Sequence, residues 1–344
     1  NPSTAVSNWR GRHDTPKAWP STAVSTWLNG GLFGASGTGA GYAAAGRSVA
    51  GNRRTTVEKF SFPSDVRSSV SALGTGVQFP AGFGNAGVAG YASGGSTPSS
   101  TYGDTQIQKY SFAADSWSTI TATLATDTNG AAGFSNSGTA GYTAGGNYLD
   151  GGFYYLTTVA KLDFSADTLT ALASGFSSAR SYAAGFSDNA VAGYAGGGYL
   201  APGYATGVDK WAFSDDSRST LGTGLNTGTT YIAGFANSGV AGYLFGGFDG
   251  VSGATEITVL IEQWTFPSNT HSLLAAVLSQ KGYELNGMAD SGVAGYRVGG
   301  YDNSAYMTVV DKLIFPSNTL SALAVGLAES KAQCATFANE GALA

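Results

Sequence analysis

The chain has few of the side chains that usually carry chemistry. Its 344 residues include one cysteine, two histidines, 17 lysines and arginines, and 22 aspartates and glutamates. One cysteine cannot form an internal disulfide, so a disulfide-stapled scaffold is excluded, although secretion is not. The net charge of −5, with no basic run longer than Arg53-Arg54, argues against a nucleic-acid-coating protein. No apolar stretch approaches about 18 residues, so no membrane span is predicted.

Proline is also scarce, with nine residues, and the 52 glycines do not fall at every third position, which excludes collagen. Hydrophobic residues make up 42% and aromatic residues 12%, which is enough to build a core and excludes a disordered low-complexity chain. Charged residues make up only 11%, so solubility must rest on Ser, Thr, Asn and Gly. Such neutral surfaces suit permanent assemblies and sugar binding.

Two sequence markers recur at the same interval of about 50 residues. The first is an Ala-Gly-Tyr tripeptide, with its tyrosine at Tyr42, Tyr91, Tyr142, Tyr194, Tyr243 and Tyr296. The second is a hydrophobic-x-Phe triplet, with its phenylalanine at Phe62, Phe112, Phe164, Phe213, Phe266 and Phe315. Two independent markers with one period indicate six copies of one structural unit.

The third copy predicts the strands of each unit. Residues 131–135 form a short apolar strand A, and an Asn-Ser-Gly turn leads to strand B at 139–146. After a variable loop, strand C spans 158–164 and strand D spans 168–172, joined by a turn at 165–167. These turn residues tolerate tight reversals and left-handed geometry. Each unit is therefore predicted to be a four-stranded antiparallel meander, and no segment shows a helical period.

A sheet this small cannot bury both of its faces alone. Stacking the copies around an axis solves the problem and predicts an all-β fold, a β-propeller. Strands A and B are expected nearest the axis, where glycine lets neighbouring backbones approach closely.

The repeat resembles the kelch family of propeller repeats. The likeness rests on the period of about 50 residues, on the aromatic residue before the C–D turn, and on a double glycine that closes strand B: Gly94-Gly95, Gly145-Gly146, Gly197-Gly198, Gly246-Gly247 and Gly299-Gly300. The first copy departs from the pattern with Ala45-Gly46, and the strand D tryptophan of kelch repeats is present only at Trp117. Glycine-rich copies of this kind also resemble, more loosely, repeats in bacteriophage tail and bacterial surface proteins.

The domain prediction is a single kelch-like propeller at 13–344, preceded by an extension or docking segment at 1–12. Complete units span about 29–73, 81–121, 131–172, 183–222, 232–275 and 285–325. Residues 17–27 align with strands C and D of the sixth unit, and residues 335–344 align with strand A and the start of strand B of the fifth. A seventh blade, shared between 13–28 and 333–344, is therefore expected to close the ring without an exposed edge. The alternative is six blades and a flanking element.

The sequence predicts no catalytic residue, no metal site and no cofactor. His271 follows a turn and is expected to be an ordinary strand D residue, His13 lies in the irregular N-terminus, and Cys334 is expected to be buried. Two histidines and one cysteine rule out zinc and make a nucleophilic triad or a galactose-oxidase-like copper site improbable. Asp104, Asp150, Asp249 and Asp302 lie in the B–C loops, where a paired-carboxylate or calcium site is conceivable but turn formation is the expected role.

A lysine precedes the hydrophobic-x-Phe triplet in five copies, at Lys59, Lys109, Lys161, Lys210 and Lys312, with Gln263 in the fifth copy. An acidic residue often precedes it in turn, at Glu58, Asp209, Glu262 and Asp311. Charges that recur in every unit are more consistent with a structural role in each blade than with a single active site. They predict an exposed or inter-blade row of ion pairs.

The B–C loops and D–A connections vary between copies, and in a meander blade both emerge on the same face. Recognition is therefore expected on that face. The tyrosine-rich B–C loops supply the candidate binding residues, because a tyrosine offers a rigid apolar plane and a hydroxyl to a sugar or a protein. These are Tyr102, Tyr148, Tyr154, Tyr155, Tyr199, Tyr204, Phe248, Asp249, Tyr301, Asp302 and Tyr306.

Three functions remain open. The leading hypothesis is a non-enzymatic structural and recognition module of a larger assembly, such as a phage tail or virion appendage that attaches to a host surface. The second is a carbohydrate-binding, lectin-like surface or secreted protein. A propeller glycan hydrolase or lyase ranks third. Expected partners are other subunits of the assembly and a cell-surface glycan or receptor, not nucleic acid. The expected location is a virion, the extracellular space or the cell surface.

Overall fold

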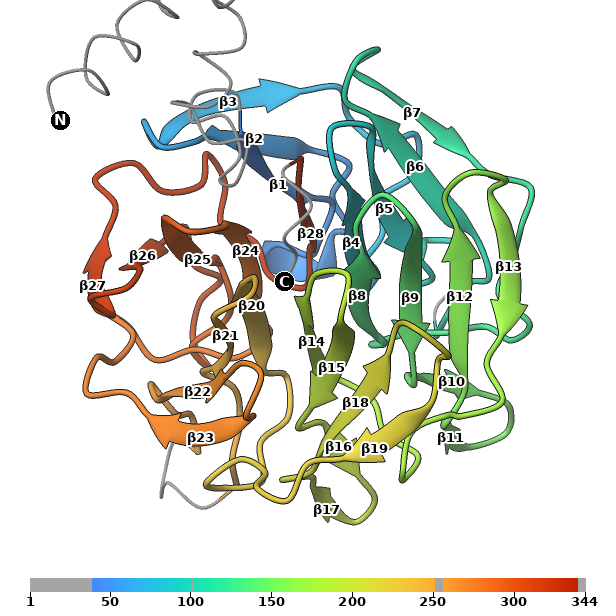
Figure 1. Ribbon diagram of the computed structural model, residues 1–344. Helices are drawn as coiled ribbons and strands as arrows, with labels where there is room; N and C mark the ends of the chain where they lie inside the picture. Colours follow the sequence, from blue (N-terminus) through green and yellow to red (C-terminus); the bar gives the residue numbers. More distant parts are fainter. Residues whose placement is uncertain (1–38, 101, 251–255, 340–344) are drawn as a thin grey trace, which may run out of the picture. The chain divides into compact units, whose positions relative to one another are not determined.

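The computed structural model describes residues 39–100, 102–250 and 256–339. These residues form six four-stranded antiparallel sheets, or blades, set around a common axis (Figure 1). In the order A to D, from the axis outward, the first three blades are β28 (Ala335–Ala338), β1 (Ala40–Ala44), β2 (Val57–Ser61) and β3 (Val66–Val70); β4 (Ala81–Asn85), β5 (Ala89–Ser93), β6 (Ile107–Ser111) and β7 (Ser116–Thr119); and β8 (Ala132–Asn136), β9 (Ala140–Ala144), β12 (Val159–Asp163) and β13 (Thr168–Ala171).

The fourth to sixth blades are β14 (Ala184–Asp188), β15 (Ala192–Gly196), β18 (Val208–Ala212) and β19 (Arg218–Thr220); β20 (Ala233–Asn237), β21 (Ala241–Phe245), β22 (Ile261–Thr265) and β23 (Thr270–Leu273); and β24 (Asn286–Asp290), β25 (Ala294–Val298), β26 (Val310–Ile314) and β27 (Thr319–Ala322). The predicted four-stranded blades and their propeller arrangement are confirmed. No helix in the described part is long and apolar enough to cross a membrane.

The strand A elements form a closed ring around the axis. Each one contacts strand A of the next blade, and β24 contacts β28, which contacts β4. Every residue of each strand B is buried, whereas the outermost strands are largely exposed. Burial therefore falls from the axis to the rim, as the glycine-rich and alanine-rich inner strands predict.

The glycine of the Ala-Gly-Tyr repeat lets neighbouring blades pack closely, because a phenylalanine side chain of the preceding blade lies directly over it. A Cβ atom added to Gly141 would lie 2.2 Å from the ring of Phe83, in strand A of the preceding blade. The same clash would arise at Gly90 with Phe337 and at Gly193 with Phe134. The glycine thus leaves room for a phenylalanine that fills the inter-blade core, while the adjacent tyrosine is also buried.

Three lysines of the expected row bridge neighbouring blades. Lys109 Nζ lies 2.7 Å from Asp167 Oδ2 in the C–D turn of the next blade and 5.7 Å from the ring centre of Tyr91 in its own blade. Lys161 and Lys312 repeat this arrangement with Asp216 and Asp65. Three of the five predicted lysines thus form inter-blade pairs, and their partners are aspartates of the C–D turns instead of the acids that precede the lysines in sequence.

The seventh blade predicted from the two ends is wrong. The described residues form six blades, and β28, which falls in the expected C-terminal half of the seventh, instead supplies strand A of the first. The physical reason is Phe337, which pairs with Tyr42 of β1 and fills the space over Gly90, as the strand A phenylalanine does elsewhere. The predictions for 1–12 and 13–28, and for the start of the first unit at 29–38, lie outside the described residues.

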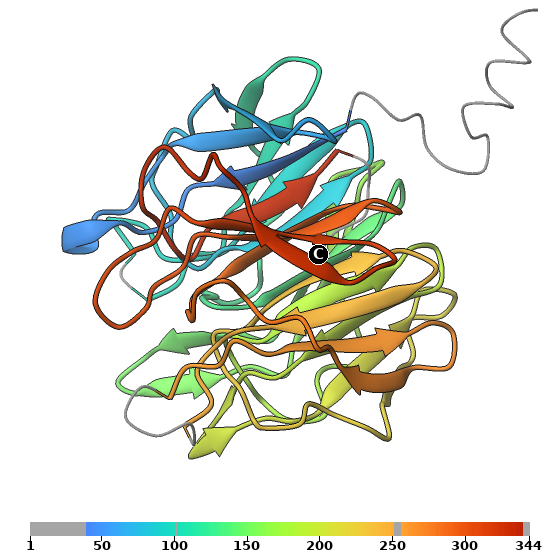
Figure 2. The same ribbon diagram turned by 90° about the vertical axis from the view of Figure 1, so that its left-hand side faces the viewer.

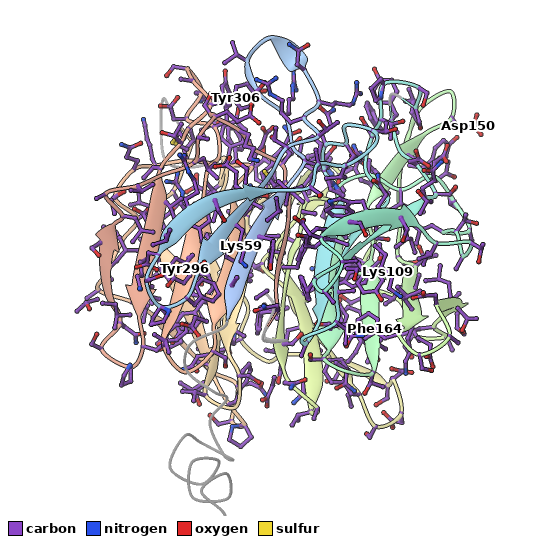
Figure 3. The ribbon with its side chains drawn as sticks, turned by 90° about the horizontal axis from the view of Figure 1, so that it is seen from above. Lys59, Lys109, Asp150, Phe164, Tyr296 and Tyr306 are labelled. Carbon is purple, nitrogen blue, oxygen red and sulfur yellow. The ribbon has the colours of Figure 1, made fainter. Side chains whose placement is uncertain are left out.

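The connections gather on two faces. We define the loop face as the face that carries the B–C loops and D–A connections, and the turn face as the face of the A–B and C–D turns. Figure 2 shows the 3-10 helix η1 (Val49–Gly51, blue) and two small hairpins, β10 (Asn147–Leu149) with β11 (Phe153–Tyr155) and β16 (Tyr199–Leu200) with β17 (Gly203–Tyr204), projecting from the loop face. In Figure 3, Tyr306 and Asp150 lie on this face, whereas Lys59 and Lys109 lie along the blades.

Candidate functional site

Six equivalent residues surround the axis where the chain enters each strand A from the loop face. We call them the axial ring: Phe79, Gly130, Tyr182, Tyr231, Glu284 and Gln333. All six have positive φ, between 53° and 65°. The N–H of each donates to the carbonyl of its counterpart in the preceding blade, at 2.6–3.1 Å, and the Phe79 N–H donates to the Gln333 carbonyl. This closed circle of hydrogen bonds fixes the backbone positions of the six residues.

The aromatic members of the axial ring line a narrow axial channel of about 100 Å³. The rings of Tyr182 and Tyr231 stack with centroids 4.2 Å apart, and Phe79 lies 5.0 Å from Tyr182. Gly130 makes this cluster possible, because a Cβ atom there would lie 2.4 Å from the Tyr182 ring. The cluster therefore forms an apolar platform at the centre of the loop face.

Beside this platform lies a cavity of about 410 Å³, which we call the aromatic cavity. Its walls come from loops of the third to sixth blades and combine aromatic planes with a few polar groups. The lining residues are Asn147, Phe153, Tyr155, Tyr182, Tyr199, Tyr204, Thr230, Tyr231, Phe248, Tyr283 and Glu284. A cavity of this size, largely aromatic and with few polar groups, has the character of a small-ligand site.

Glu284 is the acidic group of the cavity. Its side chain is partly buried, and Gln333 Nε2 donates a hydrogen bond to Glu284 Oε2 at 2.5 Å. Burial raises the pKa of Glu284 to about 7, although the Gln333 hydrogen bond and the charge of Arg47 act in the opposite direction. Burial likewise raises the pKa of the neighbouring Tyr283 to about 12, so that phenol stays protonated at neutral pH.

Four of the candidate binding residues predicted from the B–C loops line the cavity: Tyr155, Tyr199, Tyr204 and Phe248. Their rings contact one another in series. The centroid distance is 5.3 Å from Tyr155 to Tyr199, 5.9 Å from Tyr199 to Tyr204 and 5.8 Å from Tyr204 to Phe248. These four residues therefore form one wall of the cavity.

The other candidates do not line it. Tyr148 and Tyr154 stack on each other across the β10–β11 hairpin, and Tyr102 packs edge-on against Phe153. Tyr301 and Tyr306 extend the aromatic series beyond Tyr283, with Tyr301 5.5 Å from Tyr283 and 4.8 Å from Tyr306.

The aspartates of the B–C loops have turn geometry. Asp302 Oδ1 accepts hydrogen bonds from Ser304 Oγ and from the N–H groups of Ser304 and Ala305, which lowers its pKa. Asp104 Oδ1 accepts from the Gln106 N–H, Asp150 is exposed, and Asp249 is buried. Among the described residues, no three of His, Cys, Asp and Glu are grouped so that they could hold a metal ion.

The predicted set lacks the other seven lining residues: Asn147, Phe153, Tyr182, Thr230, Tyr231, Tyr283 and Glu284. All but Asn147 and Phe153 belong to the D–A connections, which were expected on the same face but supplied no predicted binding residue. The signal that would have found them is position, because the residue two places before each strand A belongs to the axial ring in all six blades. Reading that one position in every copy identifies the axial ring.

His271 and Cys334 have structural roles. His271 Nε2 lies 2.7 Å from Glu262 Oε2, and its ring packs 4.9 Å from Trp264 within the fifth blade. Cys334 is buried beside the channel, and burial raises the pKa of its thiol to about 12, so it carries no thiolate at neutral pH.

No protein-family model matches the chain, and no curated protein matches it. Among solved structures, the chain is similar to the "Structure of YjhT", with a TM-score of 0.66 over 84% of this chain and 97% of that chain. The fold is a β-propeller. The sequence identity to YjhT is 14%, so this likeness concerns the fold alone.

Proposed function

We propose that this propeller is a non-enzymatic recognition module, of kelch-like repeats, that binds a carbohydrate in the aromatic cavity. The observation that carries the proposal is the cavity itself, because it is large enough for a sugar ring and presents flat aromatic faces beside polar groups. A sugar offers apolar C–H faces and a rim of hydroxyls. The rings of Tyr204 and Phe248 suit the faces, and Asn147 and Thr230 suit the hydroxyls.

A single off-axis cavity favours one binding site per chain over one site per blade. Its walls use the loops of the third to sixth blades, which differ in length and sequence. This distinguishes the proposed module from lectin-like propellers whose equivalent blades hold equivalent sites.

We further propose that the module belongs to a larger assembly, a virion tail appendage or a cell-surface structure, and attaches it to glycans on a host surface. The likeness of the repeats to phage tail and bacterial surface proteins supports this setting.

A glycan array probed with the full chain, followed by titration of the hits, tests the proposal. We expect binding of one glycan class, no release of product from the corresponding polysaccharide, and a loss of affinity of about tenfold or more in Tyr204→Ala. Tyr154→Ala is the matched control, because it removes an exposed loop-face tyrosine outside the cavity. Turnover of the polysaccharide would overturn the non-enzymatic role, and equal effects of the two substitutions would overturn the site.

A further inference from the structure

The aromatic cavity contains a carboxylate that has no cationic partner. Among the described lining residues, Glu284 is the one carboxylic acid, and there is no lysine, arginine or histidine. The ion pairs within 4.0 Å in the described part of the chain involve other acids. Gln333 satisfies one oxygen with a neutral hydrogen bond, and Arg47 acts only from a longer range.

Tyrosine rings surround this carboxylate. Tyr231 and Tyr283 line the same cavity with ring centroids 5.8 Å apart, and Tyr283 lies 5.9 Å from Phe248. Aromatic faces carry partial negative charge and attract cations, most strongly where water is excluded. The cavity therefore has negative potential from both its rings and its one acid, which is unfavourable for an anionic ligand.

We propose that the aromatic cavity selects ligands that carry an organic ammonium group, held against Glu284 and the surrounding tyrosine rings. This inference rests on the proposed carbohydrate-binding function and narrows it to glycans that bear an amine. Two sources share this chemistry, an amino sugar with a free ammonium group and a choline-type quaternary ammonium substituent.

The protonation of Glu284 should make the binding of a cation depend on pH, whereas the binding of a neutral sugar should not. Because the pKa of this acid is raised to about 7, it is partly protonated at neutral pH, and a cation binds the ionised form. Affinity for a cation should therefore rise about tenfold between pH 6 and pH 8, and binding should release a proton. The other titratable groups around Glu284 are Arg47, Tyr182, Tyr231, Tyr283 and Tyr306; the pKa values of the four tyrosines are raised, so Glu284 is the group that changes charge in this range.

The test uses the full chain and pairs of probes that differ in charge but not in shape. Choline is compared with 3,3-dimethylbutan-1-ol, its neutral isostere, by titration calorimetry from pH 6 to pH 8. Choline has no ammonium proton to lose, so any pH dependence belongs to the protein. Glucosamine compared with glucose at pH 7 tests the amino-sugar source. We expect the charged member of at least one pair to bind about tenfold more tightly.

The variant Glu284→Gln keeps the shape and removes the charge, so it should abolish the preference for the charged probe and its pH dependence. Asp150→Asn is the control, because it removes one charge from an exposed tip of the same face and should change neither. Equal affinity for the charged and neutral probes, or an unchanged preference in Glu284→Gln, overturns the inference. If neutral glycans from the array still bind, the proposed function stands and only the amine selectivity fails; if no glycan binds, both fail.

Discussion

The glycine of each Ala-Gly-Tyr tripeptide is required by a neighbour, not by its own backbone. At Gly141 the ring of Phe83 occupies the position that a Cβ atom would take. One contact type, repeated between successive blades, thus explains why the glycine of the tripeptide and the phenylalanine of strand A recur with the same period. Glycine elsewhere in the chain need not be so constrained, and Gly74 has no atom within 4 Å of an added Cβ.

The substitution Gly141→Ala should lower the free energy of unfolding by about 2–3 kcal/mol, because a methyl group is forced against an aromatic ring in a packed core. Gly74→Ala, in open space and without a left-handed φ, should change it by less than about 0.5 kcal/mol. Urea unfolding followed by tryptophan fluorescence measures both. Similar losses in the two variants would contradict the packing explanation.

Glu284 predicts a pH dependence of stability. In the unfolded chain its carboxyl titrates near the ordinary pKa of 4.5, and in the folded protein near about 7. Between these values the folded state keeps a proton that the unfolded state has lost. The favourable contribution is therefore complete below about pH 4.5 and is lost as the pH rises through about 7.

Glu284→Gln removes this titration. We expect the variant to gain about 1–2 kcal/mol of stability over the parent at pH 8 and nothing at pH 4, a figure reduced because the carboxyl is partly exposed. Thermal unfolding at the two pH values measures the difference. A constant difference across this range would mean that the pKa of Glu284 is not raised.

At the scale of strands and loops, buried acids at one position of strand C hold the D–A connections. Asp209 in β18 is fully buried and accepts hydrogen bonds from the N–H and Oγ of Ser177 at 2.8 Å, and its carboxylate lies 3.4 Å from the buried Arg180. Glu58 in β2 has the same relation to the buried Lys331, at 3.3 Å. The acids that precede the lysines in sequence therefore bind groups of the D–A connections, and they are not part of a surface row of ion pairs.

Asp209→Ala should cost about 3–5 kcal/mol, because it leaves the guanidinium of Arg180 buried without a counter-charge. The third blade offers a natural control, since Ala160 and Thr128 occupy the equivalent positions there. The double variant Asp209→Ala/Arg180→Thr copies that neutral pair and should recover part of the loss. Chemical unfolding compares the three proteins, and a double variant no more stable than the single one would refute the unpaired-charge explanation.

The strands were largely predictable because their signals are local and repeated. Period, turn residues and apolar alternation fix each blade, and six copies remove the ambiguity of any one. The identity of the strand beside β1 was not predictable in this way. Both the segment around Phe337 and similar residues upstream of Ala40 fit the sequence pattern of strand A. The D–A wall of the cavity was missed because Glu284 and Tyr231 are far apart in the sequence and become neighbours only when successive blades pack side by side.

At the scale of the whole molecule, the ring closes without a covalent link through one short strand. β28 pairs with β1 on one side and contacts β24 and β4 on the others. Gln333, just before it, completes the axial ring by accepting the N–H of Phe79 and by donating to the carboxylate of Glu284. Integrity of the fold and geometry of the proposed site therefore depend on the same segment.

A chain that ends at Ala332 should lose both. Without β28, the edge of β1 is left unpaired and the core residues packed on Phe337 are exposed, a loss comparable to the total stability of an ordinary domain. We expect a broad, low-temperature unfolding transition or aggregation, measured by calorimetry and light scattering. If the chain that ends at Ala332 instead unfolds at the parental midpoint, β28 does not close the ring in solution, and the axial arrangement of Glu284 and its tyrosines loses its physical basis.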